Sequence, residues 1–380
     1  MKIFKITIIG ISLLSINAFA QDYVYKGLKD VEATVGINQE ENSSNETTIA
    51  AECYNPANIG QRIQAQGCED LLIVDNDSLR QMVLNDENYS DTNIFTGQVT
   101  DLSYLFCLKN NSSCTKKQAL YSISNWNTSN VTTMKGLFYG NTNFNKPLNN
   151  WNVSSVTDLS SIFREASSFN QPLNNWDVSS VTTFAVAFRE ATSFNQPLNN
   201  WDVSNAISLS NMFRFASIFN QDLSNWNVSN VENFNHIFQY TQFNYNINNW
   251  DMSSAKITSG MFGHTPYNHP LNNWDVSNVT DMSSMFSHSS FNQDISMWDV
   301  SNVTDMINMF NNATSFNQPL NSWNVSNVTN MVSMFRGANT FNQDISNWCV
   351  INISSDPYNF DLNSGFENQN SLQPNWGSCP

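Results

Sequence analysis

Few side chains in this sequence have the types and spacing that chemistry requires, and the most notable of them recur at a fixed step. Arg164, Arg189 and Arg214 follow one another at intervals of 25 residues, and Glu165 and Glu190 stand beside the first two. If that interval brings the arginines into one column, they form a basic stripe that could contact a carboxylate or an acidic partner. The competing interpretation is a solvated charge ladder in which the glutamates relieve the repulsion.

Two other columns raise the question of a metal ion. His264 and His288 are 24 residues apart, so their rings could approach, but no carboxylate or cysteine column joins them. Aspartates follow tryptophan in five places: Asp177, Asp202, Asp251, Asp275 and Asp299. Asparagine replaces them elsewhere in the same column and no compact calcium loop surrounds them, so turn capping is the better interpretation. We expect neither a metal nor a cofactor.

Catalytic motifs are missing from the sequence. It contains no Gly-x-Ser-x-Gly elbow, no phosphate-binding glycine loop and no His-Glu-x-x-His pair. A glycan hydrolase would need two carboxylates facing each other across a groove. We therefore expect a protein that is not an enzyme.

Tryptophan recurs every 24 or 25 residues from Trp126 to Trp348 and sets the frame for all these columns. Such a period predicts a repeat solenoid, in which each coil buries its apolar face against its neighbours. We expect a leucine-rich-repeat-like fold of about nine to ten coils, with short stacked parallel β-strands and short helical turns. The tryptophans are better interpreted as a buried ladder with bonded N–H groups than as a carbohydrate-stacking strip.

Two aromatic columns define the repeat further. The first, from Phe138 to Phe335, has one phenylalanine per coil, and the second, from Phe144 to Phe341, is always followed by asparagine. Three repeats, those starting at Phe238, Phe262 and Phe286, have one residue fewer between the two columns. The missing residue is therefore expected in a small turn after the first phenylalanine.

The ends of the chain differ from its repeats. Two lysines, an apolar run and Ala18-Phe19-Ala20 predict a signal peptide. The expected organisation is a signal peptide at 1–20, a flexible acidic arm at 21–52, an amino-terminal cap at 53–98, the solenoid at 99–360 and a carboxy-terminal cap at 361–380. Within the first cap, Asp77 or Ser78 is expected to cap a short helix through Leu79, Met82 and Val83.

Six cysteines flank the repeats and are candidates for disulfide bonds, as expected outside the cytosol. They are Cys53, Cys68, Cys107, Cys114, Cys349 and Cys379. Seven extra residues lie between Phe106 and Trp126, in a loop that begins at Cys107, which favours a local bridge from Cys107 to Cys114. A bridge from Cys349 to Cys379 would hold the tail over the last coil.

The unit FNQPLNSWNVSNVTNMVSMF, from Phe316 to Phe335, resembles the repeats of BspA-type leucine-rich-repeat surface proteins of bacteria. The resemblance covers about residues 99 to 360, and the tail resembles the carboxy-terminal cap that often follows such arrays. It implies an exported or cell-surface protein with a leucine-rich-repeat-like solenoid, for which adhesion is the role proposed in some members. The family supplies no catalytic residues to carry over.

Charge limits the partners. The net charge is −16, and it becomes −18 when Lys2 and Lys5 leave with the signal peptide. An acidic chain of this kind disfavours nucleic acid and anionic membranes, and no segment suggests a membrane span. We expect a secreted or cell-surface scaffold that binds a protein or a glycan, with Arg164, Arg189 and Arg214 as the candidate contact. The alternative is a structural or self-assembling envelope component without a specific ligand.

Overall fold

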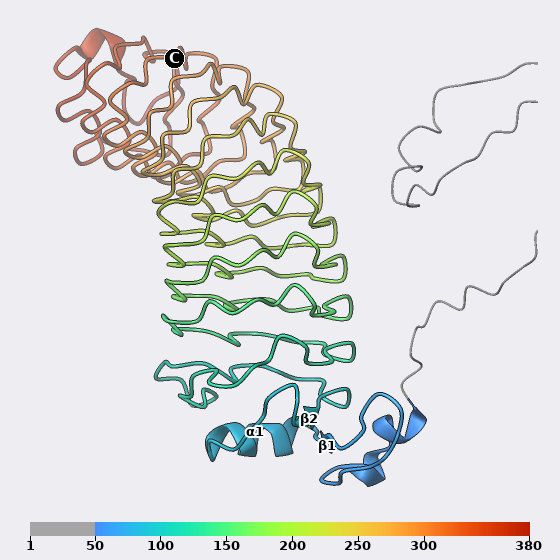
Figure 1. Ribbon diagram of the computed structural model, residues 1–380. Coiled ribbons are helices and arrows are strands. Elements are labelled where there is room, and N and C mark those ends of the chain that lie inside the picture. The colour runs from blue at the N-terminus through green and yellow to red at the C-terminus, as the bar shows by residue number, and fades with distance from the viewer. Residues whose placement is uncertain (1–49) are drawn as a thin grey trace, which may run out of the picture. The chain divides into compact units, whose positions relative to one another are not determined.

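The computed structural model describes residues 50–380, which Figure 1 traces from blue to red. The predicted signal peptide at 1–20 and most of the predicted arm at 21–52 lie outside the described residues. The described helices and strands are η1 (Ala51–Tyr54), η2 (Pro56–Asn58), β1 (Leu72–Ile73), α1 (Asn76–Leu84), β2 (Ile94–Phe95) and η3 (Asn370–Leu372). All but η3 precede the repeats.

The segment before the repeats is built around one helix and one pair of short strands. β1 and β2 are parallel, with Leu72 opposite Ile94 and Ile73 opposite Phe95. The helix α1 directs its apolar side into the main core, where Leu79, Met82 and Val83 are buried. The prediction of a helix through these three residues, and of its buried face, is thus confirmed.

The capping residue of α1 differs from the prediction. Asp75 is the N-cap: its carboxylate accepts a hydrogen bond from the Ser78 N–H at 2.9 Å, and the Ser78 hydroxyl accepts one from the Asp75 N–H at 2.9 Å. This reciprocal capping box pairs two N–H groups that the first turn leaves open. The expectation that Asp77 or Ser78 is the cap was therefore wrong, because the helix begins two to three residues earlier.

Successive repeats are joined side by side. Within the described residues, nine parallel bridges run in one unbroken series, from Asp101–Thr133 through Thr133–Asp158 to Asp305–Asn330. Bridge partners are 24 or 25 residues apart, except in the first step, where they are 32 apart. The difference of seven residues (32 − 25) matches the loop predicted to begin at Cys107. Figure 1 shows the resulting stack of coils.

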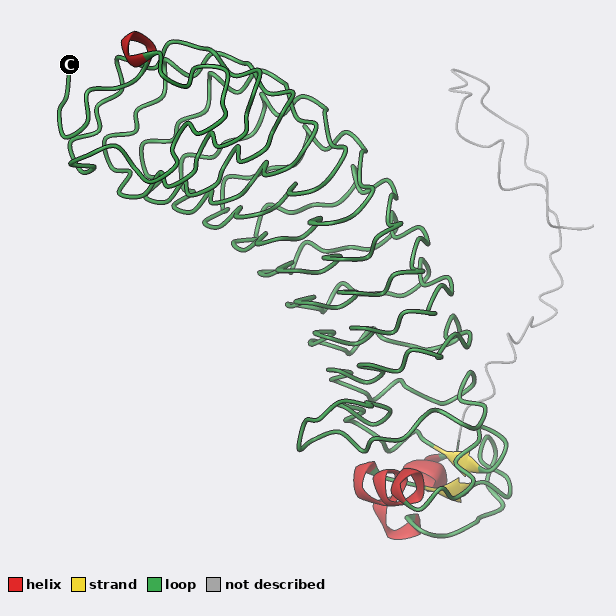
Figure 2. Cartoon of the chain, turned by 90° about the vertical axis from the view of Figure 1, so that its left-hand side faces the viewer, coloured by secondary structure: helices red, strands yellow, loops and turns green. Residues whose placement is uncertain are grey.

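The coils themselves contain less regular structure than predicted. Throughout residues 99–360, all of which are described, there is no helix and no strand longer than a single bridge residue (Figure 2). The short strands and helical turns expected in each coil are replaced by hydrogen-bonded turns. In the Met282–Phe286 stretch, for example, Ser284 has a φ of 56°, in the left-handed region, which breaks a right-handed helix.

Left-handed residues give the coils their hydrogen-bonding pattern. The positions two before and two after the first phenylalanine have positive φ, as at Ser161 (59°) and Glu165 (58°). From the same turn, the Phe163 N–H donates to the Ala187 carbonyl at 2.8 Å and the Glu165 N–H to the Arg189 carbonyl at 2.7 Å. N–H groups therefore point to the next coil and carbonyls to the previous one, so most backbone groups of the turn are paired.

The core between the turns is filled by stacked aromatic rings. Phe163 stacks on Phe169 of its own coil, with 3.8 Å between ring centroids, and on Phe188 of the next coil at 5.4 Å. The asparagine after the second aromatic column continues the ladder at its edge, since the Asn170 N–H donates to the Asn145 side-chain oxygen at 2.9 Å. The aromatic rings thus bury apolar surface inside the coil, and the asparagine side chains accept hydrogen bonds from the backbone N–H groups beside them.

The tryptophans form the buried ladder that the sequence favoured. Trp176 and Trp201 are each 3% exposed, with rings 6.5 Å apart and nearly parallel. The Trp201 Nε1–H donates to the Leu173 carbonyl of the preceding coil at 2.8 Å, and the same bond recurs along the column. A ladder with covered faces and bonded N–H groups leaves no face of these ten tryptophans, Trp126 to Trp348, for a sugar.

The three short repeats compensate for their missing residue with a hydroxyl. In long repeats the third residue after the first phenylalanine is usually alanine, and the Phe169 N–H donates to the Ala166 carbonyl. In the short ones it is Thr241, Thr265 or Ser289. The Thr241 hydroxyl donates to the Phe238 carbonyl at 2.6 Å and accepts from the Phe243 N–H at 3.2 Å. The side chain thus replaces a backbone carbonyl, and the deletion lies in the predicted turn.

Both ends of the ring stack are closed by rings set across it. At the carboxyl end, Phe366 meets Phe335 at 87° and Phe341 at 76°. At the amino end, Tyr89 meets Trp126 at 69°. A ring set edge-on covers the face of the last stacked ring, and its own face is not oriented to continue the stack.

Candidate functional site

The side chains that the core does not use gather on the turn after the first phenylalanine. We call this surface the Arg–ring ridge, and it comprises Tyr139, Arg164, Glu165, Arg189, Glu190, Arg214, Phe215, Tyr240, His264 and His288. Each stands one or two residues after a phenylalanine of the first column. The left-handed residue of that turn directs its N–H toward a carbonyl of the next coil, so consecutive coils place these side chains next to one another. Most are half-buried, and Tyr240 and His288 are exposed.

The first two arginines of the ridge are neutralised by the glutamates that follow them. The Arg164 Nε lies 3.3 Å from the Glu165 carboxylate, and the Arg189 Nε lies 3.1 Å from the Glu190 carboxylate. The Arg164 guanidinium also lies over the Tyr139 ring, 4.6 Å from its centroid. The relieved charge ladder considered from the sequence therefore describes these two coils well.

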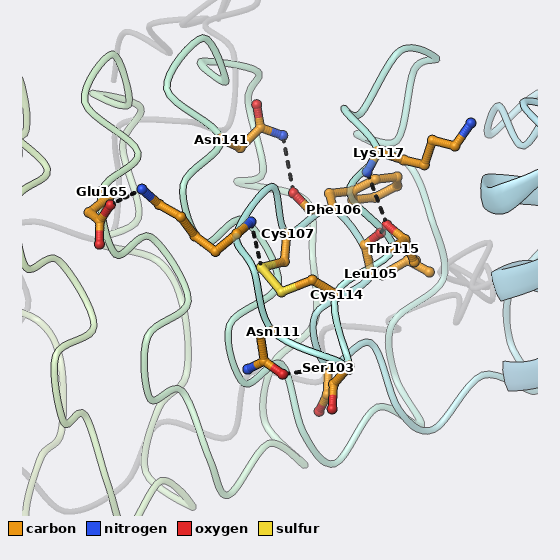
Figure 3. The surroundings of a disulfide bond; sticks show 12 residues. Ser103, Leu105, Phe106, Cys107, Asn111, Cys114, Thr115, Lys117, Asn141 and Glu165 are labelled. Carbon is orange, nitrogen blue, oxygen red and sulfur yellow. Dashed lines mark hydrogen bonds and ion pairs between the residues drawn. A yellow bond between two sulfur atoms is a disulfide. The ribbon is translucent and has the colours of Figure 1, made fainter.

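The disulfide loop contributes a cation to the same end of the ridge. Cys107 and Cys114 are bonded, and the Lys109 ammonium between them forms an ion pair with Glu165, two coils further along (Figure 3). This contact raises the pKa of Lys109. The loop therefore both begins the repeats and fixes a charge on the ridge.

Arg214 breaks the pattern of paired charges. The residue after it is Phe215 instead of glutamate, and no ion pair with Arg214 occurs within residues 50–380. Its Nη1 donates to the Asn211 side chain at 3.3 Å, and its guanidinium lies 5.0 Å from the Phe215 ring centroid. The Nε atom of Arg214 is buried without a hydrogen-bond partner, as is that of Arg164, but Arg164 has the carboxylate of Glu165 beside it. Burial, and then the positive charge of Arg189, lowers the pKa of Arg214.

Beyond Arg214 the ridge continues as a ladder of four rings. Phe215 stacks on Tyr240 with 4.5 Å between centroids, Tyr240 on His264 at 4.0 Å, and His264 on His288 at 4.2 Å. These separations are shorter than those in the buried ladders, where Phe163 and Phe188 are 5.4 Å apart. Because each inner ring has a neighbour on both faces, the ladder presents ring edges to solvent.

The stacked histidines do not form a metal site. Imidazole nitrogens coordinate in the plane of the ring, and the two planes are inclined by only 12°, so their lone pairs run side by side instead of converging. The His288 nitrogens also contact the Ser287 hydroxyl at 2.9 Å and the Asn312 amide at 3.1 Å. No group of three metal-ligating side chains occurs within the described part of the chain.

The aspartates after tryptophan act in turns, as the sequence favoured. The Asp202 carboxylate accepts a hydrogen bond from the Ser204 N–H at 3.0 Å, and Asp251 accepts one from the Ser253 N–H at 3.0 Å. Hydrogen bonds from the serine side chains and N–H groups lower the pKa of both carboxyls. Asp177, Asp275 and Asp299 make the same N–H contact.

All six cysteines lie at disulfide distance from a partner. The Cα atoms of Cys53 and Cys68 are 6.1 Å apart, those of Cys107 and Cys114 are 5.0 Å apart, and those of Cys349 and Cys379 are 4.1 Å apart. The last two pairs are those that the sequence favoured. The pairing of Cys53 with Cys68 had been left open. The two cysteines form a small buried cluster together with Ile73 and Phe95.

The ring ladder was only half visible in the sequence. His264 and His288 had been related to one column, whereas Phe215 and Tyr240 had been missed although they occupy the same position after Phe213 and Phe238. The usable signal was that shared offset of two residues. The other two histidines lie apart from the ladder: His236 has a pKa lowered to about 4, chiefly by burial, and His269 contacts the Asn244 carbonyl at 2.8 Å.

Comparison with known families adds one finding. A family model described as "Mycoplasma protein of unknown function, DUF285" matches residues 100–215, 174–270 and 258–376. The chain belongs to the DUF285 family. The three DUF285 matches follow one another along the chain and include the repeats, which supports the repeat organisation independently of the tryptophan count. No curated protein and no solved structure matches the chain.

The DUF285 description assigns no function, so the ridge must be interpreted from its own residues. Within residues 50–380, no helix has the length and apolarity that a bilayer span requires.

Proposed function

We propose that this chain is an exported or cell-surface repeat scaffold that binds a protein or glycan through the Arg–ring ridge, with adhesion as its role. In this proposal the coils form a leucine-rich-repeat-like solenoid of the BspA type, with caps at 53–98 and 361–380. The observation that carries it is the ridge itself. Ten side chains that the buried ladders do not need line up on the same turn of consecutive coils, and they include Arg214, which forms no ion pair within residues 50–380.

Export is supported by the cysteines. Three pairs at disulfide distance and no free cysteine in the described residues are typical of an oxidising compartment. The predicted signal peptide agrees with this proposal. The overall acidity supports a partner other than nucleic acid.

A role without catalysis is supported by the surface hollows. Five hollows of the described surface have volumes of 360–520 Å³. Each is lined by one carboxylate residue only: Asp101, Asp344, Glu232, Asp356 or Glu52. A pair of carboxylates for glycoside hydrolysis is therefore not assembled in any of them.

The alternative, a self-assembling envelope component, has less support if assembly occurs through the ends of the stack. The crosswise rings of Phe366 and Tyr89 cover those ends. Lateral association remains open to this alternative. Sedimentation of a strictly monomeric chain at high concentration would argue against it.

The proposed function is tested by binding the fluorescently labelled chain, residues 21–380, to a printed array of extracellular-matrix proteins and polysaccharides. A ridge variant carrying Arg189→Gln, Arg214→Gln and Tyr240→Ser should lose the signals that the unaltered chain gives. The control variant carries Ile207→Thr, Ile218→Ser and Met297→Asn, which replace exposed apolar residues outside the ridge by residues found elsewhere in their columns. Equal signals from the ridge and control variants would contradict the proposal.

A further inference from the structure

The centre of the ridge has unmet hydrogen-bonding capacity, and this deepens the proposed function, on which the inference rests. The Nε of Arg214 is buried without a partner. One coil further, in the same column, the residue Gln239 is 7% exposed, and its Oε1 likewise lacks a partner. A buried polar atom without a hydrogen bond costs about 1–3 kcal/mol, so two in adjacent coils call for a specific explanation.

The charge around these atoms favours an anion. Arg189 lies in the preceding coil. Its guanidinium forms an ion pair with Glu190, whose side chain is 38% exposed. Arg214 forms no ion pair within residues 50–380. Burial, and then the positive charge of Arg189, lowers the pKa of Arg214, and the carboxylate of Glu190 offsets part of this effect. These two positive charges lie side by side on a chain whose net charge is −16. An anionic group placed here would meet both guanidinium groups.

We propose that Arg189, Arg214 and Gln239 bind the acidic group of an anionic polysaccharide that lies along the ridge. A carboxylate or sulfate would accept from the guanidinium groups and from the Gln239 Nε2 amide, whereas the Gln239 Oε1, itself an acceptor, would accept from a hydroxyl of the same sugar. The adjacent ring edges of Tyr240 and His264 then face the next sugar, where a phenol and an imidazole can bond to hydroxyls.

A polysaccharide fits this surface better than an acidic peptide. Tight protein interfaces centre on apolar or aromatic anchors inserted into pockets. Here the ring faces are already covered by stacking, because Phe215 lies between Arg214 and Tyr240, and Tyr240 lies between Phe215 and His264. The surface left for a ligand is a row of polar ring edges and charges, with one position per coil. The spacing between coils is about 4.8 Å, that of neighbouring strands. A regular polymer with repeated acidic and hydroxyl groups is complementary to such a row.

The test is titration calorimetry of the chain, residues 21–380, with four polymers: polygalacturonate, dextran sulfate, neutral dextran and poly-L-glutamate. The first two distinguish carboxylate from sulfate as the bound group. We expect one or both to bind, with neutral dextran inert and poly-L-glutamate weaker. Arg214→Gln should weaken binding by about tenfold or more, because it removes hydrogen bonds between charged groups.

Arg336→Gln is the matched control. Arg336 occupies the same column as Arg214, is exposed and has no ion pair within the described residues, so its loss changes the net charge equally. We expect a change of less than about twofold, the size of a weak surface electrostatic effect. Equal weakening by Arg214→Gln and Arg336→Gln would reduce the effect to general electrostatics and overturn the site.

Three further outcomes would also overturn the inference. They are no binding by either acidic polysaccharide, stronger binding by poly-L-glutamate, and binding of neutral dextran that Arg214→Gln leaves intact. The proposed function would survive these results if the ridge variant still lost its signals on the array. It would fail separately if the array showed no dependence on the ridge.

Discussion

His264 and His288 stack face to face, with 4.2 Å between their ring centroids and 12° between their planes. Both side chains leave the backbone at left-handed residues, with φ of 57° and 55°, at the same position of consecutive coils. Burial lowers the pKa of both imidazoles, and His288 lowers that of His264 further by like-charge repulsion. The fold therefore favours the neutral pair.

This stack predicts a loss of stability in mild acid. A histidine whose folded pKa lies below its unfolded value of 6.5 binds fewer protons in the native state than in the unfolded state. Well above pH 6.5 the histidine is neutral in both states and does not change the free energy of unfolding. As the pH falls below 6.5, protonation of the unfolded chain lowers the free energy of unfolding. The urea midpoint should fall between about pH 7 and about pH 5. The double variant His264→Asn/His288→Asn should show a flatter dependence, because Asn312 already occupies this column.

His269→Gln serves as the control for that experiment, since glutamine is the usual residue of its column and His269 lies outside the ladder. Its slope should equal that of the unaltered chain. An unchanged slope in the double variant would show that other groups carry the acid sensitivity, and His236, with its pKa lowered to about 4, is the first to examine.

The hydroxyls of the short coils predict a second result. Thr241→Ala should destabilise the chain by about 1–3 kcal/mol, because it leaves the buried Phe243 N–H without its partner, whereas the Phe238 carbonyl keeps the bond from the Thr241 N–H. Thr241→Ser should cost much less, since it keeps the hydroxyl that Ser289 supplies in the same role. Urea unfolding measures both. Equal losses would assign the effect to the methyl group.

Val186 predicts a stabilising substitution. Its φ is 55°, although a β-branched residue in the left-handed region is strained. Glycine occupies the same column at Gly136 and Gly260, also with positive φ. Val186→Gly should therefore raise the free energy of unfolding by about 1 kcal/mol. Ala187→Gly, at the neighbouring residue without positive φ, should lower it by about as much. A loss at Val186 would mean that packing of its methyl groups outweighs the strain.

The carboxyl end predicts a local effect. The Cys349–Cys379 bridge lies where the Val350 N–H donates to the Ser378 carbonyl at 2.9 Å and Trp376 packs edge-on against Phe360. Replacing both cysteines by serine should reduce hydrogen-exchange protection in the last coils, because each coil is supported only by its neighbours. Coils around Trp176 should keep their protection. A uniform loss along the chain would contradict this local account.

The buried part of the fold was largely predictable because it repeats. A tryptophan or phenylalanine that returns every 24 or 25 residues has to meet its copy in the next coil, so the Trp176–Trp201 contact follows from spacing alone. The seven-residue insertion after Cys107 and the deletion near Thr241 were located by the same count. The cap of α1 was misplaced because Asp75, Asp77 and Ser78 are all good capping residues in isolation.

The turns and the ridge were less predictable for a physical reason. Left-handed conformation is normally signalled by glycine or asparagine, but here Val186, Glu190 and Phe215 adopt it because coil-to-coil hydrogen bonds impose it. Because the sequence did not reveal this conformation, the direction in which the side chains of the turn point could not be inferred from it. Phe215 and Tyr240 thus looked like unrelated substitutions in two different repeats, although the structure brings their rings to 4.5 Å.

In each turn the N–H groups point to the next coil and the carbonyl groups to the previous one, so one coil can take the place of another. Phe163 bonds to the coil of Ala187 in the same way as Phe310 bonds to that of Met334, at 2.8 and 2.9 Å. Duplication or loss of one unit by recombination between such similar repeats would preserve every contact except at the new junction. Each event would change the reach of the ridge by about 4.8 Å. Recombination can therefore lengthen or shorten the row of turns in fixed steps while both ends stay the same.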